Sequence, residues 1–362
     1  MGKTLRWTLI VALLLLVIAA LSYFLFQRQL GEMLFERAVT QRVAQDPTAD
    51  LPDGLHVYMC GTGSPMADHN RAGPCVGIVA GEQVVLFDVG AGSMRTANRM
   101  GFPVARIQTL YLTHLHSDHF DGIGELLVQA WVGGSRDTPL PVLGPAGTLE
   151  TVEGINAAYR VDSTYRTAHH GEAVANPAGY GFAPVEFEVT QGDDNMVVFN
   201  RDGLMITVFP VSHDPIVNPV GYRIDYGGRS VVISGDTIYQ QSLVEAARDV
   251  DILIHEALDP DMIGLMEQAA EDRGADAIAK VLFDIQDYHA SPEDAARAAQ
   301  EAGAGELILY HIVPPLPTSF LNAYFLGDAE SLFDGPIHVG EDGMRISLPA
   351  DTDTVTISNT LR

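Results

Sequence analysis

Four side chains of the kinds that bind metal ions lie in one short segment, THLHSDH: His114, His116, Asp118 and His119. Side chains two positions apart in extended backbone point the same way, so His114 and His116 can bind one ion. A turn after Ser117 then presents Asp118 and His119 to a second ion. Imidazole and carboxylate together are a usual ligand set for zinc. The spacing therefore predicts a metal site rather than a surface cluster of histidines.

Strands and helices must alternate around this segment to position it. The apolar stretch RIQTLYL predicts a strand before it, and a helix is expected from about Phe120 to Trp131 after it. A second helix is expected from Ser291 to Ala302, because Ser291 is a good N-cap and Pro292 fits the first helical position. Further strands are expected in GLMITVFPVSHD, VGYRIDYGGRSVVISGD, DVDILIHEA and GELILYH. This alternation predicts a layered α/β fold with sheets inside and helices outside.

The pattern H-x-H-x-D-H after a strand resembles the signature of the metallo-β-lactamase superfamily. Three later residues match the family's ligands in order, each at a strand end: His213 in PVSHD, Asp236 in SGDT and His311 in LILYH. The resemblance covers about residues 55–315 and implies a four-layer αββα sandwich. It also implies two zinc ions, with Asp236 and a water between them. One ion would be bound by His114, His116 and His213, and the other by Asp118, His119 and His311.

The resemblance also implies a chemistry for these ions. A water that bridges two zinc ions loses a proton near neutral pH and becomes a nucleophile. Asp118 would orient this water or accept its proton, and Asp88 in FDVGAG matches the family's Asp that supports the His-rich loop. The sequence therefore predicts a zinc-dependent hydrolase whose site attracts anions.

Within the superfamily, three motifs are similar to those of the branch that holds ribonuclease Z, phosphodiesterases and arylsulfatases: CGTGSP, IHEA and YHASPEDAARAA. Asp236 also stands where one β-lactamase subclass has Cys. By this resemblance His289 donates a proton to the leaving group, with His255 and Glu256 beside it. The residues alone leave alternatives open, in which His289 only caps or packs beneath a helix and the His-Glu pair is a hydrogen-bonded support.

The segment that follows His311, PPLPTSFLNAYFLGD, carries three aromatic side chains close together: Phe320, Tyr324 and Phe325. Because pockets are commonly apolar around a few polar groups, we expect these aromatics to wall the substrate pocket. The alternative is that they pack as an ordinary helix face onto the core.

The run from Trp7 to Phe26 carries no charge and is long enough to span a bilayer as a helix. Lys3 and Arg6 precede it, so the positive-inside rule predicts a cytoplasmic N-terminus and an extracytoplasmic catalytic domain in a single-pass protein. A cleaved signal peptide is the alternative. The expected divisions are a cytoplasmic tail over 1–6, an anchor over 7–26, a loosely helical stalk over 27–53, the hydrolase domain over 54–350 and a C-terminal tail over 351–362.

Charge and chain length shape the expected function. The net charge of −26 disfavours binding to phosphate backbones. His213 and Asp236 are only 23 positions apart, which leaves no room for the long arm with which bacterial ribonuclease Z enzymes usually grip tRNA. We therefore expect a membrane-anchored dizinc hydrolase of a small phosphodiester, sulfate ester or related ester, with nucleic acid an unlikely partner. The alternatives are a tRNA 3′-processing ribonuclease Z and, as a minor one, a lactamase or lactonase.

Two features stay open at this level. A homodimer is neither predicted nor excluded by any pattern in the chain. Cys60 and Cys75 either form a disulfide or remain two buried thiols in neighbouring strands.

Overall fold

The computed structural model describes residues 2–43, 46–190, 192 and 195–361. The chain divides into two compact units, Met1–Ala49 and Asp50–Arg362. The first unit contains one long helix, and the second contains both sheets and all the candidate ligands named above.

Helix α1 (Lys3–Arg42) is long and apolar enough to cross a membrane. Its apolar side chains, such as Leu16, Phe24 and Leu25, are exposed to solvent. The helix continues to Arg42, through most of the segment that we expected as a loosely helical stalk. Residues 27–42 are rich in Gln, Glu, Leu and Arg, which are good helix formers, and the first proline comes only at Pro47.

Two sheets lie at the centre of the second unit, with the strand orders β15-β14-β1-β2-β3-β4-β5-β6 and β13-β12-β11-β10-β9-β8-β7 among the described residues. The strands of the first sheet are β1 (Gly54–Gly61), β2 (Cys75–Ala80), β3 (Gln83–Phe87), β4 (Thr109–Tyr111), β5 (Leu140–Gly144), β6 (Phe182–Glu186), β14 (Met344–Pro349) and β15 (Thr356–Asn359). The strands of the second are β7 (Met196–Arg201), β8 (Leu204–Pro210), β9 (Val220–Tyr226), β10 (Arg229–Ile233), β11 (Ile252–Leu258), β12 (Glu306–Val313) and β13 (Ile337–Val339).

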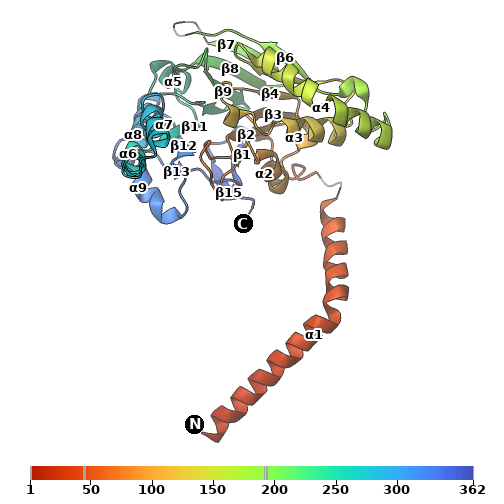
Figure 1. Ribbon diagram of the computed structural model, residues 1–362. Coiled ribbons are helices and arrows are strands. Elements are labelled where there is room, and N and C mark those ends of the chain that lie inside the picture. Colours follow the sequence, from red (N-terminus) through yellow and green to blue (C-terminus); the bar gives the residue numbers. More distant parts are fainter. Residues whose placement is uncertain (1, 44–45, 191, 193–194, 362) are drawn as a thin grey trace. The chain divides into compact units, whose positions relative to one another are not determined.

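Helices cover the outer faces of both sheets (Figure 1). Those that follow strands of the first sheet are α2 (Ser93–Met100), α3 (Ile123–Val128) and α4 (Thr148–His170). Those associated with the second sheet are α5 (Gln241–Ala246), α6 (Pro260–Glu271), α7 (Asp276–Asp284), α8 (Pro292–Ala302) and α9 (Asn322–Leu326). The layers are thus helix, sheet, sheet and helix, as the resemblance implied.

The largest core cluster lies between the sheets and is built from inward-facing aliphatic side chains, such as Val57, Ile78, Ile224 and Ile254. A second cluster joins the alanines of α8 to the outer face of β11 and β12, and a third joins α2 and α3 to the first sheet. Burial of apolar area on both faces of each sheet holds the strand ends in fixed positions. Those strand ends carry the candidate ligands.

Several local expectations can be compared with the structure. The helix expected over Ser291–Ala302 is confirmed as α8, and Ser291 and Asp294 form a capping box at its start. The helix expected from Phe120 begins only at Ile123 and continues from Gln129 as a π-helical turn. Residues 351–362, expected as a tail, include β15, which pairs antiparallel with β14. Cys60 and Cys75 form a disulfide between β1 and β2.

Candidate metal centre and active-site cavity

The His-rich segment follows β4 directly and carries its four candidate ligands into the centre of the domain. His114 and His119 are fully buried, and the 3₁₀ turn Ser117–His119 places Asp118 beside His119. The other three candidates come from strand ends of the second sheet. His213 follows β8, Asp236 follows β10, and His311 lies in β12.

The candidate ligands form two groups. Within each group, the nitrogen and oxygen atoms that could bind a metal ion lie within 4.8 Å of one another. The first group is His114, His116, His213 and Asp236, and the second is Asp118, His119 and His311. His116 Nδ1 lies 3.1 Å from both His114 Nε2 and His213 Nε2. His311 Nε2 lies 3.2 Å from Asp118 Oδ2. The structure thus brings together all seven residues that the sequence singled out.

Asp236 stands between the two groups. Its Oδ2 atom lies 3.2 Å from both His119 Nε2 and His311 Nε2, and 3.8 Å from both His114 Nε2 and His213 Nε2. One carboxylate oxygen can therefore reach partners on either side, as a bridging ligand must.

The donor set fits divalent metal ions. Burial lowers the pKa of His213 to about 4 and that of His114 well below the usual value, so both imidazoles are neutral and can act as ligands. Burial would raise the pKa of Asp236, but the nearby His311 and His119 hold it well below its usual range. Among the described residues, Asp236 Oδ1 and His311 Nδ1 have no hydrogen-bond partner. Buried polar atoms are seldom left unpaired, and bound ions are one recognised reason.

Asp88 supports the His-rich segment from beneath. Its Oδ1 accepts a hydrogen bond from the Thr113 backbone N–H at 2.9 Å, and its Oδ2 lies 2.8 Å from His119 Nδ1. A proton on Nδ1 directed at this carboxylate leaves Nε2 of His119 free to face the site. Two glycines that the sequence reasoning missed allow the close packing there. A Cβ at Gly90 would lie 2.3 Å from the Asp118 carbonyl oxygen, and one at Gly73 would lie 3.0 Å from it.

His289 and Glu256 form a second feature of the site. Glu256 Oε1 lies 2.9 Å from His289 Nδ1 and accepts hydrogen bonds from the backbone N–H groups of Thr237 and Ala290, both at 3.1 Å. Burial acts to lower the pKa of His289, but the Glu256 carboxylate outweighs it and raises the pKa to about 9. His289 is therefore protonated at neutral pH. His255 is fully buried, and its Nδ1 lies 2.7 Å from the backbone oxygen of Glu256.

A cavity of about 430 Å³ opens over these groups. Its polar lining includes His116, Asp118, Asp236, His289 and His311. The sequence gave no site role to the other lining residues, and the aliphatic ones among them carry no spacing signal that marks a pocket. The other lining residues are Ser64, Pro65, Met66, Ser117, Val281, Ile285, Tyr288 and Val313.

The three aromatics expected to wall the pocket lie elsewhere. Phe325 is buried in the core cluster beneath α9, whereas Phe320 is 93% exposed and Tyr324 is also exposed. None of them is among the residues that line the 430 Å³ cavity. The segment that carries them turns away after cis-Pro314 and borders a different cavity instead.

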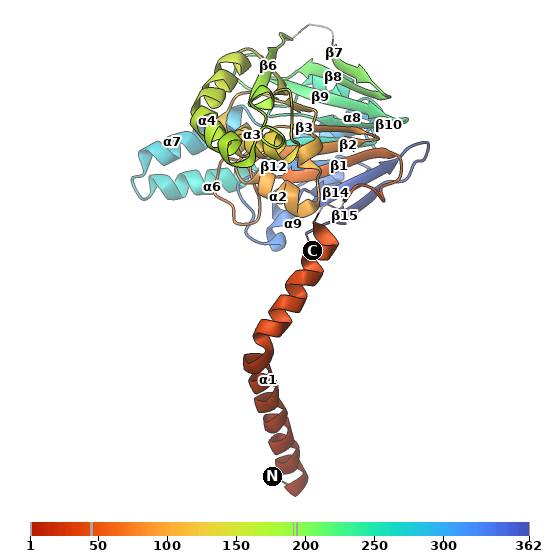
Figure 2. The same cartoon turned by 90° about the vertical axis from the view of Figure 1, so that its right-hand side faces the viewer.

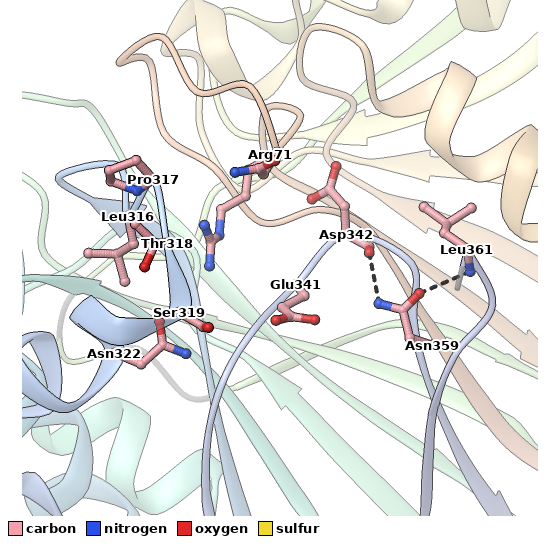
Figure 3. Close-up of a pocket in the computed structure, with 11 residues that line it drawn as sticks. Arg71, Leu316, Pro317, Thr318, Ser319, Asn322, Glu341, Asp342, Asn359 and Leu361 are labelled. Atoms are coloured by element: carbon pink, nitrogen blue, oxygen red, sulfur yellow. Dashed lines mark hydrogen bonds between the residues drawn. The ribbon is translucent and has the colours of Figure 1, made fainter. Parts of the chain in front are cut away.

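That second cavity, of about 330 Å³, contains none of the candidate ligands (Figure 3). Figure 3 shows Arg71 on one side of it and Asp342 on the other. Asp342 accepts hydrogen bonds from the backbone N–H groups of Thr62 at 3.0 Å and Ala72 at 2.8 Å. Burial raises the pKa of Asp342 to about 6 despite these bonds. Asp342 thus ties together the two ends of the loop between β1 and β2.

Comparisons with known proteins agree with this architecture. A family model described as the β-lactamase superfamily domain matches residues 83–312. Ribonuclease Z from Mycobacterium avium (strain 104) is 38% identical over 298 residues, which cover 82% of this chain and 99% of that protein. Ribonuclease Z from Mycolicibacterium gilvum (strain PYR-GCK) is 37% identical over 297 residues, covering 81% of this chain and 96% of that protein.

Two solved structures share the fold. The metallo-β-lactamase fold protein YhfI from Bacillus subtilis matches with a TM-score of 0.57 and 22% identity, over 82% of this chain and 100% of that one. The short form of human tRNase Z matches with a TM-score of 0.57 and 21% identity, over 81% of this chain and 99% of that one. The expected αββα fold is therefore confirmed.

The relatives contradict our main expectation for the function. We expected a membrane-anchored hydrolase of small esters and judged nucleic acid an unlikely partner, whereas the relatives are named ribonuclease Z over nearly their whole length. The net charge was misleading because salt screens exposed charges beyond a Debye length of about 8 Å at physiological ionic strength. Groups at the site itself then decide whether a phosphate binds there. The missing arm was misleading too, since β9 and β10 join His213 to Asp236 directly in a chain that still matches these relatives.

The matched family model spans β3 to β12, and thus the His-rich segment, His213, Asp236 and His311. The full-length ribonuclease Z matches and the two solved structures agree with that model and with the observed layers. This chain belongs to the β-lactamase superfamily and has the metallo-β-lactamase fold.

Proposed function

We propose that this protein is a metal-dependent endoribonuclease of the ribonuclease Z type, which cleaves a phosphodiester at the 3′ end of precursor tRNA. The observation that carries the proposal is one cavity lined by members of both candidate metal groups and by His289, whose Nδ1 faces Glu256. The mycobacterial relatives named ribonuclease Z support the choice of substrate.

Two zinc ions are the cofactors we propose for the two groups. His114, His116 and His213 would hold one ion, and Asp118, His119 and His311 would hold the other, with Asp236 between them. When bound, the ions supply positive charge for the scissile phosphate and an acidified water for the attack. A zinc-bound neighbour of the same fold, PqqB from Methylobacterium extorquens, agrees with this choice of metal.

The chain's own residues then have separate tasks. Asp118 is only partly buried and lines the cavity, so its carboxylate can orient the attacking water and accept its proton. The oxygen of that water forms a bond to phosphorus while the bond from phosphorus to the leaving ribose oxygen breaks. His289 donates its proton to this oxygen, and Glu256 orients the imidazole through its Nδ1. Asp88 holds His119 and acts as a positioning residue.

We also propose a location for the enzyme. Lys3 and Arg6 before the apolar part of α1 support a single-pass anchor with a cytoplasmic N-terminus and an extracytoplasmic catalytic domain. The Cys60–Cys75 disulfide supports the same side, because disulfides persist in oxidising compartments. Protease protection of intact cells tests it, since an extracytoplasmic domain is digested from outside. A protected domain would contradict this orientation and place the catalytic domain on the cytoplasmic side.

The activity is tested with the full-length chain in detergent, loaded with zinc and incubated with a 3′-extended precursor tRNA. We expect one cut at the end of the acceptor stem, detected by sequencing gels. The His116→Ala protein is the control for a contaminating nuclease, because His116 belongs to a candidate metal group. Failure of the zinc-loaded protein to cut precursor tRNA, with nitrophenyl phosphodiesters cleaved normally, would contradict the tRNA proposal.

A further inference from the structure

The chain between Glu256 and His289 forms a helical hairpin. It consists of α6 and α7, which pack side by side and extend from the body of the domain (Figure 2). Both ends of the insertion meet at one carboxylate, because Glu256 itself is bonded to His289 and to the backbone N–H of Ala290. None of the sequence motifs quoted above lies in α6 or α7. Its position beside the candidate proton donor raises the question of what it contributes.

The hairpin supplies part of the lining of the active-site cavity. Val281 in α7 and Ile285 just after it line the cavity together with Met66 and Val313, alongside the candidate ligands. Val281 is 56% exposed. Apolar side chains that face an open site favour contact with an apolar surface of a ligand.

A polar group in the same lining also lacks a partner. The Ser64 side chain lines the cavity and is more than nine-tenths buried. Among the described residues its hydroxyl has no hydrogen-bond partner. A buried hydroxyl nearly always has one, so a ligand that fills the cavity would satisfy this group. The ligand must therefore combine an apolar surface with a hydrogen-bonding atom.

We propose that Val281, Ile285 and Met66 form a seat for the nucleoside that keeps the phosphate after cleavage, and that the Ser64 hydroxyl bonds to a polar atom of this nucleoside. The inference deepens the proposed function and rests on it, because a phosphodiester at the metal groups brings its attached nucleoside into the same cavity. A nucleobase has apolar faces that pack on aliphatic side chains and polar edges that reach a hydroxyl. The volume of about 430 Å³ lies in the range of roughly 300–1,000 Å³ that ligand pockets occupy.

The test compares two diesters with the same leaving group. Thymidine 5′-(4-nitrophenyl phosphate) carries a nucleoside on the side that keeps the phosphate, and methyl 4-nitrophenyl phosphate carries only a methyl group. The zinc-loaded full-length protein should show a higher kcat/KM for the thymidine diester. Val281→Asn should lower the ratio of the two kcat/KM values about tenfold, since losing one apolar contact in a pocket costs 10-fold or more. Ser64→Ala should lower the same ratio by roughly fivefold, through KM rather than kcat.

A matched control lies on the same helix. Ile278 is 59% exposed, one turn before Val281, and does not line the cavity. Ile278→Asn changes the surface of α7 as much as Val281→Asn does and should leave the ratio unchanged. A fall in the ratio of equal size in both variants would overturn the proposal in favour of a general effect on the hairpin.

A binding measurement separates this inference from the proposed function. Calorimetry should show thymidine 5′-monophosphate binding to the zinc-loaded protein about tenfold more tightly than methyl phosphate, with the difference lost in Val281→Asn. Equal affinities for the two ligands, or equal kcat/KM values for the two diesters, would overturn the seat even if precursor tRNA is cut. A clear preference for the nucleoside without any cutting of precursor tRNA would sustain the seat and contradict the tRNA proposal.

Discussion

The candidate metal groups and the α6–α7 hairpin border the same cavity but are built in opposite ways. The seven candidate ligands come from separate strand ends and a tight turn, and most of them are fully buried against both sheets. The hairpin is one continuous segment with exposed apolar side chains, among them Val281 and Phe283. Groups that carry out chemistry need a rigid frame, whereas a surface for substrate contact needs only one firm attachment.

The largest effect is expected from the loss of a side chain in the candidate metal groups. His116→Ala removes a side chain whose Nδ1 lies 3.1 Å from two other candidate ligands. We expect kcat/KM for any diester to fall at least about a thousandfold, the scale of losing a catalytic group. Bound zinc, measured by elemental analysis, should fall with it. His169→Ala, which changes an exposed histidine on α4, is the control. Full activity in a metal-depleted His116→Ala protein would refute the dizinc assignment.

The next effect concerns the point where the two regions meet. His289→Ala removes the proposed proton donor that Glu256 holds at the base of the hairpin. Loss of general acid catalysis should slow RNA cleavage by roughly 10²–10⁴-fold, because a ribose oxygen needs a proton to leave. Nitrophenyl diesters need little protonation and should lose far less. Equal losses on both kinds of substrate would assign His289 a structural role.

A smaller effect is expected at Asp88, which contacts a candidate metal ligand without belonging to either metal group. Asp88→Asn keeps the shape of the side chain but loses the carboxylate that faces His119 Nδ1 at 2.8 Å. Because such partners fix the tautomer of a metal-binding histidine, zinc affinity should fall about 10- to 100-fold. Competition with a chelator measures this directly. Unchanged zinc affinity would mean that the strand ends alone hold the site.

The smallest effect is on stability and appears as a pH dependence. Because burial raises the pKa of Asp342 to about 6, the folded state binds a proton there more readily than the unfolded chain. The stability that this group contributes is present at about pH 4 and is lost as pH rises through about 6. The stability of the wild type relative to Asp342→Asn should therefore fall by on the order of 2 kcal/mol between pH 4 and pH 7. Urea unfolding at the two pH values measures it, and a difference that grows with pH would contradict the sign.

The candidate metal groups could be predicted from the sequence, whereas the part of the cavity that the hairpin lines could not. His114, His116 and His119 could be predicted as metal ligands, because residue type and spacing together fix their geometry. Val281 and Ile285 gave no such signal, since an aliphatic residue on or next to a helix resembles many others. The prediction that the segment from Pro314 to Asp328 walls the pocket was wrong, because nearness to His311 in sequence does not bring it near in space. Asp88 was predicted by resemblance, whereas the role of Gly90 follows only from the backbone packing.

The Glu256 carboxylate, which joins the two ends of the hairpin insertion, has a consequence for the history of this fold. Because the loop is closed at its base by bonds to His289 and Ala290, the catalytic groups do not depend on how long the intervening chain is. Lengthening a closed loop costs only about 0.6 kcal/mol for each doubling. A change in the length of the hairpin should therefore cost the fold little stability. Selection can change what the enzyme accepts while its reaction stays the same.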